Sequence, residues 1–147
     1  MKYLKKATSA ILALCMTFAL CVSASANETL FGSNSKSASV GTTATITGEI
    51  WSYNYVYNGT SYFEPRAKTI VNSSKTMAQV TVKLECRYND TGALVSGEAS
   101  RSDSNNNSNS VDVKLKFGAP RIAPVVAFSS HGATYSKSDV LYMTTNL

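Results

Sequence analysis

The stretch from Trp51 to Phe63 is rich in aromatic side chains, four of which recur at every second position. They are Trp51, Tyr53, Tyr55 and Tyr57, followed by Tyr62 and Phe63, and we call the six together the aromatic stripe. Flat exposed rings stack on the faces of sugars, and the polar tips of Tyr and Trp reach hydroxyl groups and water. A contiguous exposed apolar patch usually marks a binding surface. The aromatic stripe therefore predicts a binding site for a glycan or cell-wall polymer.

Two arrangements of the aromatic stripe are open. If a strand that begins at Thr43 continues unbroken, the rings lie opposite Ala44, Ile46 and Ile50 and form an outer face. A bulge or bend near Ser52 would instead turn the rings into the core. The sequence favours the second arrangement, because only Val56 would then have to face solvent.

The residue types of a thiol or serine hydrolase are present, but their contexts do not fit catalysis. Cys86 falls on the apolar side of an alternating strand, where a buried thiol is inert. His131 is the only histidine and is expected to be a hydrogen-bonded loop residue. A Ser-His-Asp set that includes Asp139 can be drawn, yet no nucleophile-elbow motif accompanies it. We expect no catalytic residues and no enzyme activity.

Carboxylates and metal ligands are equally sparse. Glu49, Glu64, Glu85 and Glu98 could form a glycosidase pair, and Glu85 and Glu98 are candidates to meet across a hairpin. Charges on strand surfaces are ordinarily just solvated. One His, one Cys outside the N-terminal segment and nine scattered acids give no zinc or calcium spacing. We expect no metal and no cofactor.

The clearest structural pattern lies between Ala78 and Tyr88. Apolar side chains occupy every second position there, and polar side chains fill the positions between them. This period of two predicts a strand with one buried face. Residues 89–92 (Asn-Asp-Thr-Gly) favour a turn, so residues 93–101 are predicted to return as the second arm of a hairpin.

Further strands are predicted at Thr43–Trp51, Arg66–Asn72, 111–117, 122–129 and 140–145, with an extended arm or short edge strand at Asn27–Ser39. Asn58-Gly59 predicts a tight turn. Loops are predicted at Thr60–Pro65, at the Ser- and Asn-rich Ser100–Ser110, and at Ser130–Ser138. Seven or eight short strands without a helical period indicate an all-β, antiparallel two-sheet sandwich. A small closed β-barrel is the alternative.

Residues 1–26 have the features of a cleaved secretory signal peptide. Three lysines precede an apolar run from Ile11 to Val22, and Ala24-Ser25-Ala26 is a small-x-small cleavage site. The run is too short for a membrane-spanning helix. Cleavage after Ala26 would leave 27–147 as a single secreted domain. We expect this domain to have no disulfide, because Cys86 would be its one cysteine. We also expect no transmembrane segment in it.

Removal of the signal peptide would also change the charge. It takes away three of the 14 Lys and Arg residues and none of the nine acids, so the net charge would fall from +5 to +2. So small an excess argues against nucleic acid or anionic lipid as a partner.

These features predict a small secreted non-catalytic protein that binds a glycan or cell-wall polymer at or outside the cell surface. Its signal peptide is similar to those of bacterial exported proteins. In its size, its export signal and its Ser-, Tyr- and Asn-rich composition, the chain resembles the lactococcin 972 family of small secreted β-sandwich proteins. That resemblance extends to these general features only and does not indicate membership. A secreted bacteriocin-type antagonist is therefore one alternative, and a structural module that assembles through strand edges is another.

Overall fold

The computed structural model describes residues 27–95, 98–116 and 125–147 of the chain. The predicted signal peptide, and the first part of the strand predicted at 122–129, lie outside these residues. Eight strands are described: β1 (Asn27–Ser39), β2 (Thr43–Tyr57), β3 (Thr60–Ser73), β4 (Met77–Tyr88), β5 (Ser100–Ser108), β6 (Ser110–Lys114), β7 (Val125–Thr134) and β8 (Ser138–Asn146).

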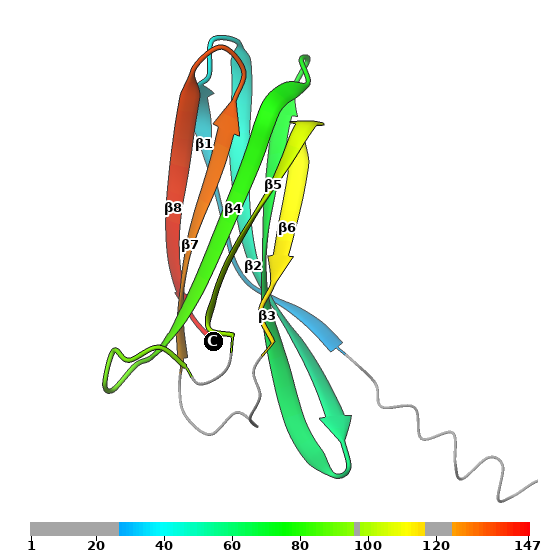
Figure 1. The fold of residues 1–147 in the computed structure, drawn as a ribbon, viewed down its shortest axis with the longest axis vertical. Helices are drawn as coiled ribbons and strands as arrows, with labels where there is room; N and C mark the ends of the chain where they lie inside the picture. The colour runs from blue at the N-terminus through cyan, green and yellow to red at the C-terminus, as the bar shows by residue number, and fades with distance from the viewer. Residues whose placement is uncertain (1–26, 96–97, 117–124) are drawn as a thin grey trace, which may run out of the picture.

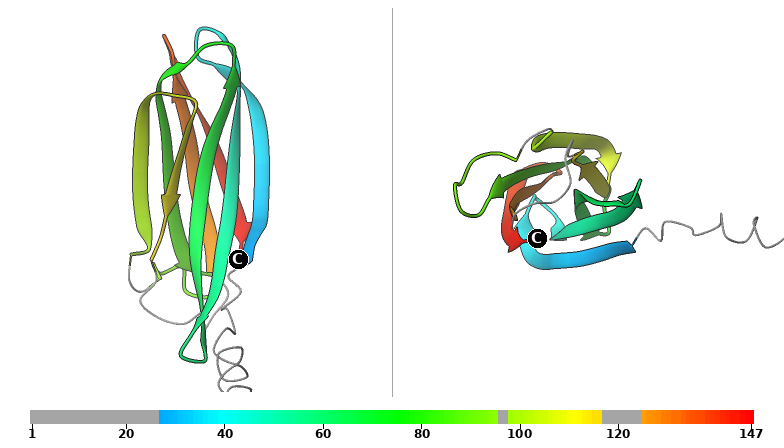
Figure 2. Two further views of the ribbon diagram at one scale, coloured as in Figure 1. Left: turned by 90° about the vertical axis from the view of Figure 1, so that its right-hand side faces the viewer. Right: turned by 90° about the horizontal axis from the view of Figure 1, so that it is seen from below.

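The strands form two antiparallel sheets of four strands each (Figure 1). Sheet A has the order β1-β2-β3-β6, and sheet B has the order β5-β4-β7-β8. The two sheets face each other in a sandwich-like arrangement that is elongated along the strands (Figure 2). The all-β, two-sheet antiparallel prediction is confirmed, and the strands belong to two separate sheets rather than one closed sheet. Among the described residues, no helix is long and apolar enough to cross a membrane.

The alternating pattern in β4 places its apolar side chains between the sheets. Val80, Val82, Leu84 and Cys86 are each at most 1% exposed, whereas Lys83 on the opposite face is exposed. Ala78 departs from the pattern: it is exposed, because Met77 occupies the core at this end of the strand instead. β4 pairs with β5 on one side and β7 on the other, so it lies inside sheet B.

The return arm of the predicted hairpin is displaced along the chain. The turn at 89–92 forms, with the Gly92 amide donating to the Tyr88 carbonyl at 2.9 Å. Leu94 then makes only an isolated bridge to Arg87, and regular pairing resumes at Ser100 opposite Glu85. The loop prediction for Ser100–Ser110 is therefore wrong. β5 is held to β4 by backbone hydrogen bonds, which do not depend on side-chain type. Its exposed Ser and Asn side chains are therefore compatible with an edge strand.

The loop predicted at Thr60–Pro65 is also wrong, and the loop predicted at Ser130–Ser138 is wrong except for its last turn. Asn58 and Gly59 have positive φ angles of 49° and 74° and join β2 directly to β3, so Thr60–Pro65 is strand rather than loop. β7 continues to Thr134 because its small residues pair with β4 as far as Gln79. The turn before β8 contains only three residues.

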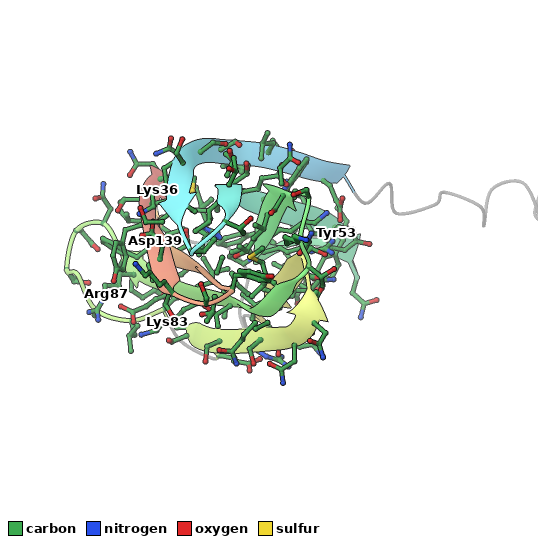
Figure 3. All side chains as sticks on the ribbon, turned by 90° about the horizontal axis from the view of Figure 1, so that it is seen from above. Lys36, Tyr53, Lys83, Arg87 and Asp139 are labelled. Atoms are coloured by element: carbon green, nitrogen blue, oxygen red, sulfur yellow. The ribbon has the colours of Figure 1, made fainter. Side chains whose placement is uncertain are left out.

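The long edges of the two sheets are tied together on both sides. On one side, Lys36 of β1 donates to Asp139 of β8 at 2.6 Å, and the two side chains lie together in Figure 3. On the other side, the chain crosses directly from β5 in sheet B to β6 in sheet A at Asn109. The core between the sheets includes Ile46, Ile50 and Leu115, each 0% exposed.

Candidate functional site

The aromatic stripe lies on the outer face of sheet A. Along β2, Ile50 and Ser52 are 0% and 1% exposed, whereas Trp51, Tyr53 and Tyr55 alternate with them and are half-buried. Half-buried rings on an outer face leave part of their surface open to a ligand. The arrangement in which a bulge near Ser52 turns the rings into the core is therefore wrong.

The irregularity lies in the neighbouring strand instead. β2 pairs with β3 without a register shift from Ala44 to Tyr57. In β1, the register shifts between Leu30 and Gly32, and Phe31, the extra residue, packs against the core. The bulge therefore lies in β1, and the alternation of β2 is left intact.

The last three side chains of the aromatic stripe do not all lie on the same face of sheet A. Tyr62 lies opposite Tyr55 in the register and shares its outer face. Phe63 is 4% exposed and belongs to the core, so it cannot take part in an exposed site. Tyr57 lies within β2, but its side chain is outside the described residues.

Three tyrosines form a cluster near the end of the β2–β3 hairpin. The ring centroids of Tyr53 and Tyr55 are 5.9 Å apart, and those of Tyr55 and Tyr62 are 5.3 Å apart with nearly parallel planes. The ammonium of Lys114 lies 5.2 Å from the centroid of the Tyr53 ring. Burial, followed by the nearby charge of Glu64, raises the pKa of Tyr55 above its ordinary value of 10.0.

Charged side chains from four strands surround the rings. The Trp51 indole donates to Glu49 at 3.0 Å, and Arg66 lies between Glu28 at 3.3 Å and Asp112 at 3.0 Å. A small recess of about 100 Å³ beside the Trp51 ring is lined by Glu28, Glu49, Arg66 and Lys68. The surface therefore combines aromatic area with donors and acceptors of both signs.

Among these charged residues, the sequence singles out only Glu49, and as a possible glycosidase carboxylate rather than as part of an aromatic site. Tyr62, Glu64, Arg66 and Lys68 alternate with buried residues in β3, which is the signal that could have identified them. Pro65 obscured that signal, because a proline usually argues against an interior strand. Here its carbonyl still accepts from the Leu115 amide at 2.9 Å.

His131 lies in the core of the sandwich and not in a loop. It is 0% exposed, with Nδ1 2.9 Å from the Thr69 hydroxyl and Nε2 2.8 Å from the Ser129 hydroxyl. Thr69 donates its own proton to the Thr81 carbonyl, so it accepts from Nδ1–H and Ser129 donates to Nε2. Burial lowers the pKa of His131 to about 4. The ring is a neutral connection between the two sheets.

The Ser129–His131 pair does not complete a catalytic set with Asp139. The Asp139 carboxylate is bound by Lys36 and by the Ser39 amide at the edge of the sandwich. A nucleophile must also be reachable by substrate, and Ser129 is only 5% exposed.

The four glutamates considered as a glycosidase pair are each engaged separately. Glu85 is 2.6 Å from Arg87, Glu98 is 3.6 Å from Arg101, and Glu64 is 3.6 Å from Lys114, while Glu49 accepts from Trp51. Within the described ranges, no three His, Cys, Asp or Glu side chains group in a way that could hold a metal ion.

Cys86 is expected to resist thiol reagents in the folded protein. It is 0% exposed, and burial, with a smaller effect of Glu85, raises its pKa to about 12. Since the thiolate is the reactive form, alkylation at pH 8 followed by peptide mapping should leave Cys86 unmodified in buffer and modified in denaturant. Equal labelling in both conditions would show that the core opens around β4.

No protein-family model, curated protein or solved structure matches this chain. Its own geometry is therefore the basis for assigning a function.

Proposed function

We propose that the protein is a secreted, non-catalytic binding protein whose ligand is an uncharged glycan chain. The observation that carries the proposal is the placement of Trp51, Tyr53, Tyr55 and Tyr62 on the outer face of sheet A, half-buried and outside the core. Aromatic rings stack on the apolar faces of sugars, and phenol and indole tips hydrogen-bond to hydroxyl groups. The predicted signal peptide would bring this face to the outside of the cell.

The length of the aromatic surface favours an oligosaccharide over a single sugar. Trp51 and Tyr55 are four residues apart in one strand, which corresponds to about 13 Å. Tyr62 extends the surface sideways onto β3. A ligand that covers all four rings must be extended, as a polysaccharide chain is.

The charges around the rings favour an uncharged ligand. Four carboxylates and three cationic groups alternate across the outer face of sheet A, and several of them pair with one another. They are Glu28, Glu49, Glu64, Asp112, Arg66, Lys68 and Lys114. Because opposite charges so close together cancel at longer range, the face offers no strong field for a polyanion. The same groups can donate to and accept from sugar hydroxyls.

The test is retention of the purified protein on insoluble cell wall and on a panel of uncharged polysaccharides. Trp51→Ala and Tyr53→Ala are the test variants, and Tyr135→Ala is the matched control, because Tyr135 is 40% exposed in the turn before β8. Each test substitution should weaken binding by about 3- to 10-fold, as loss of about 0.5–1.5 kcal/mol of aromatic contact would do. The Tyr135 variant should bind as the parent does, and thermal unfolding checks that all variants are folded.

Two outcomes would overturn the proposal: no retention of the parent on any polymer, or equal retention of the parent and both folded test variants. The two alternatives raised by the sequence have their own readouts. A bacteriocin-type antagonist clears a lawn of related bacteria, and a self-assembling module elutes as large species in gel filtration.

A further inference from the structure

The outer face of sheet B carries two adjoining depressions that share Lys83 and Ser130. The first, of about 270 Å³, is also lined by Glu85, Arg87, Phe128 and Tyr142. The second, of about 440 Å³, is also lined by Gln79, Thr81, Ser102, Asp103 and Ser104. Together they form one shallow groove that crosses all four strands of the sheet.

The register explains why this face is hollow. Lys83 of β4 pairs with Ser102 of β5 and with Ser130 of β7, and Ser130 pairs in turn with Tyr142 of β8. Directly paired residues share a face of the sheet. Small serines therefore alternate with the large Lys83 and Tyr142 side chains across one row, and the large side chains form the walls.

One end of the groove is aromatic. Tyr142 is 76% exposed and Phe128 is 42% exposed, and both line the same depression. A tyrosine this exposed contributes little to the core, so folding does not account for its presence. Exposed aromatic area beside polar groups is typical of a binding surface.

The other end of the groove is lined by hydroxyl and amide groups and by the carboxylate of Asp103. Thr81, Ser102 and Ser104 each provide a hydroxyl that both donates and accepts, and Gln79 provides an amide with both functions. The charges near the aromatic end are mixed in sign: Glu85 lies 2.6 Å from Arg87 and 3.7 Å from Lys83. Two cations, Lys83 and Arg87, and two carboxylates, Glu85 and Asp103, line the groove, so its formal charges cancel. Rings at one end and hydroxyls at the other, without a net charge, are complementary to a polyhydroxylated, uncharged ligand.

We infer that the groove on sheet B is a second glycan-binding site, so that one molecule bridges two glycan chains. The inference rests on the function proposed for sheet A. Tyr53 of sheet A and Lys83 and Arg87 of sheet B lie on opposite sides of the molecule (Figure 3). Packed sheets are about 10 Å apart and their outer faces point away from each other, so a straight chain on one face cannot also lie on the other.

Bridging is measured with one polysaccharide in two forms. The insoluble form retains the protein, and a fluorescent soluble form of the same polymer is then added. The parent should capture the soluble polymer on the insoluble one. Tyr142→Ala, which removes the more exposed of the two rings in the groove, and Ser102→Trp, which fills the polar end from an edge strand, should each lower this capture by about 3- to 10-fold while the protein is still retained. Tyr135→Ala should capture as the parent does.

The outcomes separate the inference from the proposed function. If the parent is not retained, the glycan function fails and the second site fails with it. If the parent is retained through Trp51 and Tyr53, but captures no soluble polymer or captures it equally after both sheet B substitutions, only the second site is overturned. If sedimentation shows that the parent is a dimer and Tyr142→Ala is a monomer, the groove is an interface between copies, which also overturns the inference.

Discussion

Replacement of Gly48 by alanine is expected to destabilise the protein by about 3 kcal/mol, the upper part of the range for overpacked cores. A Cβ atom at Gly48 would collide with Cδ2 of the His131 ring, and it would lie 2.6 Å from both Nε2 of His131 and Sδ of Met143. Non-bonded carbon contacts are optimal only beyond about 3.5 Å. Either the ring or the backbone of β2 must move.

The His131 ring is poorly placed to move. Both of its nitrogens are hydrogen-bonded, one to Thr69 of sheet A and the other to Ser129 of sheet B. A shift of the ring would break at least one of these bonds and leave a buried polar group without a partner, which costs about 1–3 kcal/mol. Met143 is flexible and can move aside, so the histidine decides the outcome.

Denaturant unfolding measures this effect, and Gly32→Ala in the adjacent strand is the matched control. A Cβ at Gly32 would meet its nearest neighbour, Thr145, at 3.4 Å, an ordinary contact, so stability should change by less than about 1 kcal/mol. The Gly48→Ala cost should shrink in a His131→Ala background, because residues in contact couple in a double-mutant cycle. An unchanged cost in that background would contradict the collision with His131.

The sequence predicts those parts of the fold that depend on local patterns. The burial of Val82 and Leu84 follows from alternation alone, and the Asn58-Gly59 turn follows from its two residue types. β5 could not be predicted in this way, because an edge strand of exposed Ser and Asn is held by backbone pairing to a distant strand. Such pairing leaves no trace in side-chain periodicity.

In the candidate site too, features set by local spacing can be predicted from the sequence, and features set by strand pairing cannot. The period-two spacing of Trp51, Tyr53 and Tyr55 is local and was visible. The direction in which these rings face was not, because it depends on which strand takes the irregularity, and β1 takes it at Phe31. The charged group around Arg66 joins Glu28 of β1 to Asp112 of β6. Its members are far apart in sequence, so only the register of sheet A brings them together.

The protein is expected to lose stability on mild acidification because of His131. The unfolded chain binds a proton at the ordinary histidine pKa of 6.5, whereas burial lowers the folded pKa to about 4. Above pH 6.5 neither state is protonated, and there is no effect. Between pH 6.5 and 4 the unfolded state gains a proton that the folded state excludes. The free energy of unfolding therefore decreases as the pH is lowered from 6.5 to 4, by a total on the order of 3 kcal/mol.

Asp139 acts in a separate and lower window. The hydrogen bond from Lys36, followed by that from the Ser39 amide, lowers the Asp139 pKa to about 2. The stabilisation from this carboxylate is present above its ordinary pKa of 3.8 and is lost as pH falls towards 2. Because the group lies at the protein surface, solvent screening makes its contribution small. A loss of stability between pH 6.5 and 4 can therefore be distinguished from the loss caused by Asp139.

Urea unfolding at pH 7.0 and pH 4.5 measures the effect of His131 directly. His131→Gln is the decisive variant, because an amide can still hydrogen-bond to Thr69 or Ser129 but does not titrate. Between the two pH values, the free energy of unfolding of the parent should decrease by most of the amount expected for His131. The variant, although less stable at pH 7.0, should lose much less over the same interval. Equal losses in both proteins would mean that other groups carry the pH dependence and that the buried imidazole tolerates its proton.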